Sequence, residues 1–305
     1  MKGITGMRAC IIVNPTAGRR RRRPLARFIA ALRAGGAQVR VLTTRHAGHA
    51  QELARQALGA AGTDCIIAAG GDGTIAEVAQ VLAGTQQRMG IFPAGSANVL
   101  ARELGIPFAP QAAARLILSG ASATIWPGMA EDTKHARLFV QMAGIGFDAC
   151  VVHGLPSRLK RMVGRTAYVL TMFGAALRYR FTTLQVQVDG TTHHAHGVVV
   201  SKGRLYGGRF VLCHTGMQHE AGFRVIMLET EGLLATLRMG CALLLGRVER
   251  MHDVRIVTGH DIEVHAATPV PVQVDGDVLG MTPVRIRDAG RPLHLAIESR
   301  QIWNN

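Results

Sequence analysis

The stretch Cys65-Ile66-Ile67-Ala68-Ala69-Gly70-Gly71-Asp72-Gly73-Thr74 joins an apolar run to a glycine-rich turn. Residues 65–69 predict a β-strand buried on both faces, and residues 75–82 predict the helix that follows it. Glycines at such a junction let backbone N–H groups approach an anion closely, and a helix N-terminus favours negative charge. The carboxylate of Asp72 in the middle of this turn indicates that a cation or a proton transfer also takes part. A plain structural turn is the alternative interpretation.

Strand and helix alternate in the same way through the first 126 residues. The sequence predicts strands at residues 9–13, 39–43, 65–69 and 89–92, and helices from Pro24 and at residues 50–58, 75–82, 97–104 and 111–118. This order predicts an α/β domain over residues 1–126, with a parallel sheet covered by helices on both faces. Ligands of such sheets gather at the carboxyl ends of the strands.

The pattern changes after Trp126, where short runs bounded by turns predict an antiparallel β-sandwich domain over residues 127–290. Strands are predicted at residues 138–142, 184–188, 197–201, 209–213, 254–257, 262–266, 270–274 and 284–286. Two helical stretches interrupt them, at residues 158–178 and 233–248. Most leucines of the second stretch are expected in the core, with some lining a cavity. The C-terminal segment 291–305 holds a last strand, residues 294–298, which fits either domain.

Composition excludes several classes of protein. Hydrophobic residues make up 48% of the 305 residues, too many for a disordered chain. Of the net charge of +15, residues 1–63 carry +11, because they hold twelve bases and one acid, Glu52. This charge suits a polyphosphate ligand, an anionic membrane or a nucleic acid. Aromatic residues amount to only 5%, and none lies in the arginine run 19–23, which argues against nucleic acid.

The cysteines and the apolar segments indicate where the protein works. Five cysteines without a CxxC pair predict neither a disulfide framework nor a zinc site. The N-terminus lacks the apolar core of a secretion signal, and the apolar stretch at residues 167–177 is shorter than the ~20 residues that span a bilayer. We therefore expect a cytoplasmic protein that is peripheral on the inner face of the membrane. The sequence leaves a homodimer open.

Two further loops follow predicted strands. Asn14-Pro15-Thr16-Ala17-Gly18 comes after the first strand and precedes the arginine run, which suits a phosphate clamp, an anionic-lipid contact or a solvated loop. Pro93-Ala94-Gly95-Ser96-Ala97-Asn98 comes after the fourth strand, where Ser96 is placed to cap the next helix. Three loops with glycine and polar residues at one edge of a sheet indicate a nucleotide site more strongly than any one of them.

These motifs together resemble the diacylglycerol kinase catalytic-domain family, which includes bacterial lipid kinases and sphingosine kinases. The resemblance covers nearly the whole chain and rests on the order and spacing of its motifs. They are the loops at 14–18, 70–74 and 93–98, Thr44 with Gly48-His49-Ala50, Glu77, Ala101-Arg102-Glu103-Leu104, Gly144-Ile145-Gly146-Phe147-Asp148-Ala149, Tyr206-Gly207-Gly208 and Asp275-Gly276-Asp277. The resemblance implies an ATP- and Mg²⁺-dependent kinase that phosphorylates a hydroxyl of a lipid presented at a membrane surface, such as diacylglycerol, a sphingoid base or ceramide. It also places the chain in lipid metabolism and phospholipid biosynthesis.

The resemblance assigns roles to individual residues. The catalytic residues would be Asp275, Asp277 and Asp72; Asp72 and Asp277 would hold Mg²⁺, and the 275–277 turn would supply the general base. Asp148 would contact the lipid head group. The ATP-binding residues would be Asn14, Pro15, Thr16, Ala17, Gly18, Thr44, Gly70, Gly71, Asp72, Gly73, Thr74, Glu77, Gly95, Ser96 and Asn98. Phosphoryl transfer needs a metal ion, positioning and a carboxylate that accepts the alcohol proton, which agrees with these roles.

The sequence departs from the family pattern at Asp277, where the family usually has Glu, so that either Asp275 or Asp277 is the base. Some members hold a structural Mg²⁺ in an aspartate-rich segment, but here residues 218–223 read Gln-His-Glu-Ala-Gly-Phe, which puts that metal in doubt. The alternatives are an enzyme similar to NAD kinase, which would need an Asn-Asp or Asn-Glu pair that we do not find, and a relative that binds lipid or nucleotide without turnover. Residues 158–173, basic and then apolar, are expected to form an interfacial helix, one wall of an acyl-chain pocket or a helix packed on the sandwich.

Overall fold

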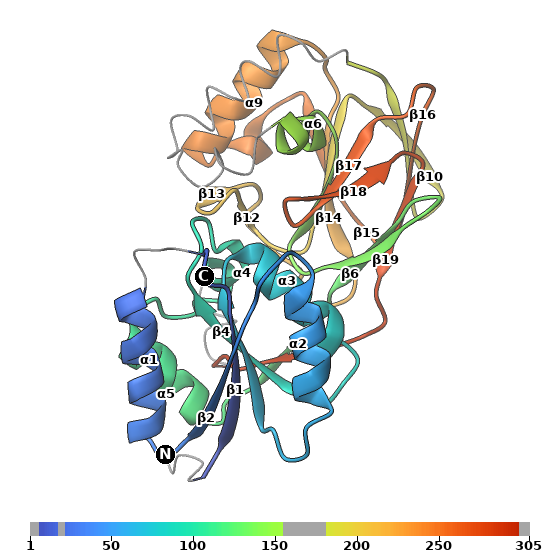
Figure 1. The fold of residues 1–305 in the computed structure, drawn as a ribbon. Coiled ribbons are helices and arrows are strands. Elements are labelled where there is room, and N and C mark those ends of the chain that lie inside the picture. Colours follow the sequence, from blue (N-terminus) through green and yellow to red (C-terminus); the bar gives the residue numbers. More distant parts are fainter. Residues whose placement is uncertain (1–5, 18–21, 155–180, 299–305) are drawn as a thin grey trace. The chain divides into compact units, whose positions relative to one another are not determined.

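The computed structural model describes residues 6–17, 22–154 and 181–298 (Figure 1). The chain divides into two compact units, of which the first comprises Met1–Trp126 with Gly290–Asn305 and the second Pro127–Ala289. The helix expected at residues 158–178 lies outside the described residues. No helix of the described ranges has the length and the apolar composition needed to cross a membrane.

The first unit is built on one six-stranded sheet. In spatial order its strands are β2 (Gln38–Thr43), β1 (Arg8–Val13), β3 (Cys65–Gly70), β4 (Arg88–Pro93), β20 (Leu293–Leu295) and β5 (Ala123–Ile125). All neighbours pair in parallel except β20 and β5, which are antiparallel. The last strand of the chain therefore belongs to the first unit, where it separates β4 from β5.

Helices cover both faces of this sheet, as the alternation predicted. They are α1 (Arg22–Ala34), α2 (His49–Leu58), α3 (Asp72–Leu82), α4 (Val99–Glu103) and α5 (Pro110–Leu118). α1 packs against α5, and α2 packs against α3 (Figure 1). Phe28 and Leu32 lie four residues apart on α1 and are fully buried, with Phe28 stacked on Phe92 of β4 at 4.5 Å between ring centroids. β3 is buried along its whole length, in agreement with its uninterrupted apolar sequence.

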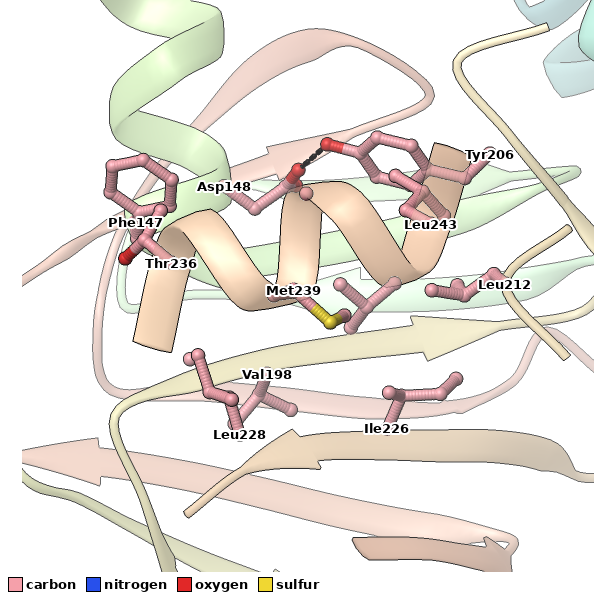
Figure 2. Close-up of a pocket in the computed structure, with 13 residues that line it drawn as sticks. Phe147, Asp148, Val198, Tyr206, Leu212, Ile226, Leu228, Thr236, Met239 and Leu243 are labelled. Atoms are coloured by element: carbon pink, nitrogen blue, oxygen red, sulfur yellow. Dashed lines mark hydrogen bonds between the residues drawn. The ribbon is translucent and has the colours of Figure 1, made fainter. Parts of the chain in front are cut away.

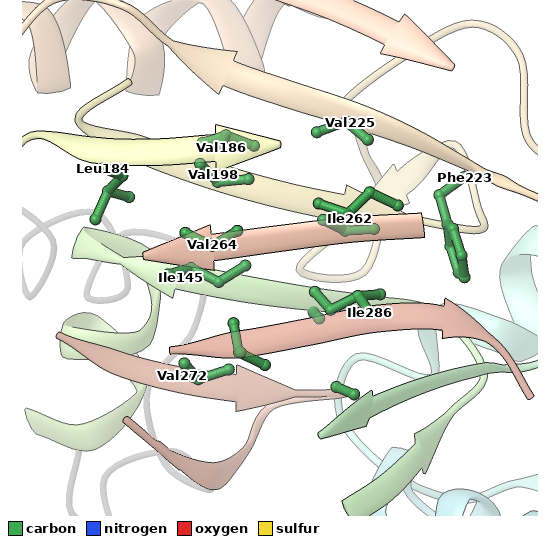
Figure 3. Packing of buried hydrophobic residues seen from close by; sticks show 14 of the residues in the cluster. Ile145, Leu184, Val186, Val198, Phe223, Val225, Ile262, Val264, Val272 and Ile286 are labelled. Atoms are coloured by element: carbon green, nitrogen blue, oxygen red, sulfur yellow. The ribbon is translucent and has the colours of Figure 1, made fainter. Parts of the chain in front are cut away.

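The second unit consists of two six-stranded antiparallel sheets with an apolar core. One sheet has the order β10 (Thr191–Ala195), β9 (Leu184–Val188), β16 (Asp261–Ala266), β19 (Val284–Asp288), β6 (Gly128–Glu131) and β7 (Ala136–Phe139). The other has the order β15 (Val254–Gly259), β14 (Phe223–Leu228), β11 (Gly197–Ser201), β8 (Met142–Gly146), β17 (Pro271–Val274) and β18 (Asp277–Met281). Val186, Ile262 and Val264 from the first sheet lie among the buried side chains of the core, together with Ile145, Val198 and Val225 from the second (Figure 3).

Smaller elements complete the second unit. They are α6 (Phe147–Gly154), the short strands β12 (Leu205–Tyr206) and β13 (Phe210–Val211), α9 (Leu233–Leu245) and the 3₁₀ turn η2 (Val248–Arg250). The strand predicted at residues 209–213 is thus only two residues long. The apolar strands β8 and β14 and the helix α6 were not predicted as separate elements.

The single strand predicted at residues 138–142 is wrong. The chain forms β7 up to Phe139 and begins β8 at Met142. The carboxylate of Asp275 explains the break, because it accepts hydrogen bonds from the backbone N–H groups of Val140, Gln141 and Met142 at 2.7, 2.9 and 3.0 Å. A side chain from a distant turn therefore takes the donors that a continuous strand would offer to a neighbour.

Candidate active site

In the first unit, the loops after β1 and β3 meet at the carboxyl ends of the strands. Asn14 follows β1, and its Nδ2 donates a hydrogen bond to Thr74 Oγ1 in the first turn of α3 at 3.1 Å. Asn14 Oδ1 accepts hydrogen bonds from Thr16 N at 3.0 Å, from Thr16 Oγ1 at 2.8 Å and from Ala17 N at 3.3 Å. Asn14 thus shapes its own loop and ties it to the glycine-rich turn. Gly18 lies outside the described residues.

The glycines of the next two loops are required by close backbone contact. A Cβ on Gly95 would lie 2.5 Å from Gly71 Cα, and a Cβ on Gly70 would lie 2.5 Å from the Thr74 side chain. Gly95 N and Ala94 N donate hydrogen bonds to Gly70 O at 3.2 and 2.8 Å. The loops after β3 and β4 therefore form one compact surface of main chain beside the N-terminus of α3, which is the kind of surface that binds phosphate.

The carboxylate of Asp72 caps the short helix α4. Asp72 Oδ2 accepts a hydrogen bond from Asn98 N at 2.9 Å, and Oδ1 accepts one from Val99 N at 2.6 Å. Burial raises the pKa of Asp72, while these N–H donors act in the opposite direction. The capping role expected of Ser96 therefore falls to Asp72, whose two oxygens reach the first N–H groups of the helix, and Ser96 is exposed.

Asn98 holds the loop after β4 in shape. It is fully buried and adopts a left-handed backbone conformation with φ 49°. Its side chain donates to Gly95 O and accepts from Gly95 N, both at 2.8 Å. Asn98 thus supports the loop from within.

Glu77 and Thr44 connect the site to α2. The carboxylate of Glu77 accepts hydrogen bonds from Gly48 N at 2.9 Å and from Ala50 N at 3.0 Å, so that it holds the N-terminus of α2. Thr44 is buried, and its N–H donates to Val13 O at 2.9 Å. The contacts of Glu77 support the loops, whereas Pro15 and Thr16 are exposed at their surface.

The sequence did not single out one group of metal-type side chains. Ligand atoms of His46, His49 and Glu52 all lie within 4.8 Å of one another. His49 Nδ1, however, accepts a hydrogen bond from the N–H of Arg45 at 3.0 Å, so the neutral ring carries its proton on Nε2. Neither ring nitrogen then has a free lone pair, and His49 is a poor metal ligand in this arrangement.

The arginine run 19–23 is described only in part. Arg22 begins α1 and Arg23 is exposed, while residues 19–21 lie outside the described residues.

In the second unit, the Asp275-Gly276-Asp277 turn separates β17 from β18. Asp275 has φ 50° and Gly276 has φ 86°, a pair of left-handed residues typical of tight hairpins. Three backbone N–H groups point at the Asp275 carboxylate, as described above. Asp277 instead has a half-exposed side chain that forms an ion pair with Arg137 Nη2 at 2.9 Å. The two carboxylates of the turn therefore have different surroundings.

The second unit also contains an apolar cavity of about 70 Å³, lined by residues of α6, β11, β14 and α9 (Figure 2). Met239 and Leu243 of α9 and Ile226 of β14 are among the lining residues. Among the described residues that line it, Asp148 of α6 is the one carboxylate. Burial raises the pKa of Asp148, while hydrogen bonds from Tyr206 and Gln273 act in the opposite direction.

Tyr206 and Gln273 fix the Asp148 carboxylate. The Tyr206 hydroxyl donates to Oδ1 (Figure 2). Gln273 Nε2 donates to Oδ2 at 2.7 Å. Gln273 Oε1 accepts a hydrogen bond from Gly276 N at 2.8 Å and so joins the cavity wall to the 275–277 turn. A Cβ on Gly144 would overlap Asp148 Oδ2, which explains the glycine at that position. The sequence did not predict the role of Gln273, because its contact with Asp148 joins residues that lie 125 positions apart.

The comparisons with known proteins agree with these features. Residues 8–130 match the family model "Diacylglycerol kinase catalytic domain", and residues 141–297 match "YegS C-terminal NAD kinase beta sandwich-like domain". The diacylglycerol kinase of Mycobacterium tuberculosis is 30% identical over 264 residues, which cover 85% of this chain and 84% of that protein. The chain belongs to the diacylglycerol kinase family of lipid kinases.

Other relatives extend this similarity. A protein of Pseudomonas putida named "Probable lipid kinase YegS-like" is 33% identical over 277 residues, 87% of each chain, and the Bacillus subtilis diacylglycerol kinase is 29% identical over 298 residues, 95% of this chain and 96% of the relative. A crystal structure of a diacylglycerol kinase from Bacillus anthracis has a TM-score of 0.70 at 19% identity and covers 98% of this chain and 99% of that one, so it shows a shared fold. The resemblance and the fold class predicted from the sequence are thus confirmed. The protein is a kinase, and family membership implies that it uses ATP.

Proposed function

We propose that this lipid kinase transfers the γ-phosphate of ATP, with Mg²⁺, to a hydroxyl group of a membrane lipid such as diacylglycerol or a sphingoid base. The observation that carries the proposal is the Asp148 carboxylate in the wall of an otherwise apolar cavity. Apolar walls suit hydrocarbon, and a fixed carboxylate oxygen accepts a hydrogen bond from a hydroxyl. At about 70 Å³ the cavity suits only a part of a lipid molecule.

The loops of the first unit support the assignment of the ATP site. Their glycines bring backbone N–H groups to the surface where a side chain would collide with the neighbouring loop. The N-terminus of α3 adds a favourable dipole for the triphosphate. Asn14, Thr16 and Ser96 offer polar side chains at the edge of this surface. The polar atoms of Glu77 and Asn98 are bonded to the backbone of the loops, so these two residues support the site without facing the nucleotide.

The donor set at Asp72 fits Mg²⁺. Carboxylate oxygens are ligands that Mg²⁺ prefers, and those of Asp72 are held in place by the backbone N–H groups of Asn98 and Val99, so that they would hold the ion directly or through water. Bound Mg²⁺ would neutralise charge on the phosphates during transfer. The half-exposed Asp277 is the second carboxylate that suits this role or that of the proton acceptor.

We assign proton acceptance at the lipid hydroxyl to Asp277 rather than to Asp275. Three N–H groups already occupy the oxygens of Asp275 and hold them in the turn, which leaves this carboxylate little freedom to meet a substrate hydroxyl. The carboxylate of Asp277 is half-exposed and held by one arginine, so it can turn toward a substrate. In this assignment Asp275 is a positioning residue that fixes the turn.

Helix α9 supports the presentation of the substrate at a membrane surface. One of its faces contributes Thr236, Met239 and Leu243 to the cavity. The rest of its surface exposes four leucines, with exposed fractions of 72% for Leu234, 36% for Leu237, 49% for Leu244 and 68% for Leu245. Helical spacing places Leu234 and Leu245 opposite the cavity and Leu237 and Leu244 on the flank between the two faces. The expectation that most of these leucines lie in the core is therefore wrong for these four, because helical spacing turns them away from the sandwich. An apolar stripe without acidic residues, followed by exposed Arg247 and Arg250, suits an anionic bilayer.

A phosphoryl-transfer assay tests the proposal. Purified protein is incubated with radiolabelled ATP and Mg²⁺ in mixed micelles that contain diacylglycerol, a sphingoid base, ceramide or no lipid, and a parallel sample contains NAD. We expect label in a lipid and no transfer with excess EDTA. Label in NAD alone would establish the NAD kinase alternative, which the name of the matched C-terminal domain model keeps relevant.

Matched variants test the assignment of the carboxylates. Asp277→Asn is expected to reduce kcat by roughly 10²-fold or more at an unchanged melting temperature, since general-base catalysis contributes about 10²–10⁴-fold. Asp275→Asn keeps the left-handed conformation, which asparagine tolerates, but it has fewer acceptor positions for the three N–H groups. Unlike Asp277→Asn, it is therefore expected to lower the melting temperature. Full activity of Asp277→Asn would contradict the assignment.

A further inference from the structure

A completely buried lysine lies at one corner of the second unit. Lys202 directly follows β11 and has no exposed surface. Its main chain is held on both sides, because Lys202 N donates to Gln141 O at 2.8 Å and Lys202 O accepts from Met217 N at 2.6 Å. Lysine is almost never fully buried unless its charge has partners, so its surroundings need an explanation.

Oxygen atoms surround the Lys202 ammonium group. Lys202 Nζ donates hydrogen bonds to Glu220 O and to Gly222 O, both at 2.8 Å, and lies 3.5 Å from Asp288 Oδ1. The face of the Phe223 ring lies 5.0 Å from the same nitrogen, measured to the ring centroid. Two carbonyl oxygens, one carboxylate and an aromatic face form the surroundings of a bound cation.

These contacts join the two sheets of the sandwich. Lys202 follows β11 and Gly222 precedes β14 in one sheet, whereas Asp288 ends β19 in the other. Asp288 Oδ2 also accepts a hydrogen bond from Gly222 N at 2.7 Å. The loop before β14 is therefore fixed by a cation and an anion together, and the cation is part of the chain.

The same loop is the segment where the resemblance implies a structural Mg²⁺ in some relatives. The residues present here do not fit that ion. Mg²⁺ requires about six oxygen ligands at roughly 2.1 Å, whereas Lys202 Nζ occupies the space among these oxygens at 2.8–3.5 Å. An ammonium group in that position would also repel a divalent cation.

We propose that the Lys202 ammonium is a built-in replacement for the structural metal ion, and that it closes this corner of the sandwich without any bound divalent cation. The charge is costly to bury, and burial lowers the pKa of Lys202 while Asp288 opposes that change. In return, the loop keeps its shape at any metal concentration. This inference concerns folding and does not depend on the proposed reaction.

Thermal unfolding of the nucleotide-free protein tests this proposal. The midpoint of Asp72→Asn, which lacks the carboxylate proposed to hold the catalytic Mg²⁺, is expected to be the same in EDTA, in millimolar Mg²⁺ and in millimolar Ca²⁺. Lys202→Met keeps most of the volume but leaves two carbonyls and Asp288 without their cation, and it is expected to melt roughly 10 °C lower. Lys134→Met, at an exposed lysine of the same unit, is the matched control and is expected to melt like the wild type.

A second variant separates the charge from the packing. Lys202→Ala removes the side chain beyond Cβ, and n-propylammonium restores the missing atoms whereas n-propanol restores only their bulk. We expect n-propylammonium alone to raise the melting temperature of Lys202→Ala toward that of the wild type. Stabilisation by Mg²⁺ or Ca²⁺ that persists in Asp72→Asn, a wild-type midpoint in Lys202→Met, or equal rescue by n-propanol would each overturn the proposal. If Lys202→Met and Lys202→Ala do not fold, the comparison of Asp72→Asn in EDTA and in divalent ions still decides it.

Discussion

At the residue scale, the few carboxylates of this basic chain mainly hold backbone in place. Asp72 accepts two backbone N–H groups and Asp275 accepts three, and Glu77 accepts two more at the start of α2. A carboxylate that accepts backbone N–H groups fixes a loop precisely. The sequence could identify these residues because they lie in glycine-flanked motifs, but it could not separate a role in catalysis from a role in shaping the loop.

Asp148 leads to a prediction about pH. Burial raises the pKa of this carboxyl above its usual 3.8 in the folded state, so its contribution to the free energy of unfolding is complete below that pH and is lost as pH rises through the folded-state pKa. Asp148→Asn keeps both hydrogen bonds, because its Nδ2 can donate to the Tyr206 hydroxyl and its Oδ1 can accept from Gln273 Nε2. We therefore expect the variant to gain stability relative to the wild type as pH rises.

Urea unfolding of both proteins between about pH 4 and about pH 8 measures this difference. A difference that does not change with pH would show that the folded-state pKa of Asp148 is normal. The same variant is expected to raise the KM for lipid in the transfer assay, since it weakens the acceptor in the cavity wall. An unchanged KM would remove Asp148 from the lipid site.

At the element scale, the sequence predicted the elements whose pattern is local. The strand at 65–69 and the helix at 75–82 agree with β3 and α3 to within a few residues, because a continuous apolar run and a glycine turn are local signals. The prediction failed at residues 138–142, where Asp275 interrupts the strand from 133 or more residues away in sequence. It also failed for the outer face of α9, because leucine content alone does not show which face packs. The spacing of apolar residues shows that a helix has an apolar face, but not which other element, if any, packs against that face.

The contact between the loops after β3 and β4 gives a prediction at this scale. Gly95→Ala places a methyl group 2.5 Å from Gly71 Cα and 2.9 Å from Asn98 Oδ1, so the two loops must move apart. We expect a loss of about 1–3 kcal/mol in the free energy of unfolding and weaker binding of ATP, measured by urea unfolding and by calorimetry. Gly59→Ala is the control: φ is −73° and the nearest atom to its Cβ is 3.6 Å away, so it should fold and bind ATP normally. Normal ATP affinity in Gly95→Ala would mean that these loops do not form the nucleotide site.

At the scale of the whole molecule, charge and apolar surface are distributed unevenly along the chain. The basic excess lies in the first 63 residues, whereas four of the eight exposed large hydrophobic side chains among the described residues belong to α9. A kinase whose acceptor is a lipid must take its substrate from a bilayer. In the proposed membrane role, the net positive charge would attract an anionic surface at long range, and the apolar stripe would bind it at short range. High salt weakens the attraction between charges but not the apolar contact, so the two contributions to membrane binding can be measured separately.

Vesicle binding tests the role of α9. Replacing Leu234 and Leu245, the two most exposed leucines, with Gln is expected to lower the partition coefficient onto vesicles of mixed anionic and neutral lipid by roughly 10²-fold or more, since each buried leucine contributes about 1.5–3 kcal/mol when fully removed from water. This loss should persist in high salt, because salt screens charge but not apolar contact. Leu58→Gln, at an exposed leucine of the first unit, is the matched control and should bind vesicles like the wild type. If the double variant binds vesicles normally but changes from dimer to monomer in sedimentation, the stripe is a contact between two copies and not a membrane surface.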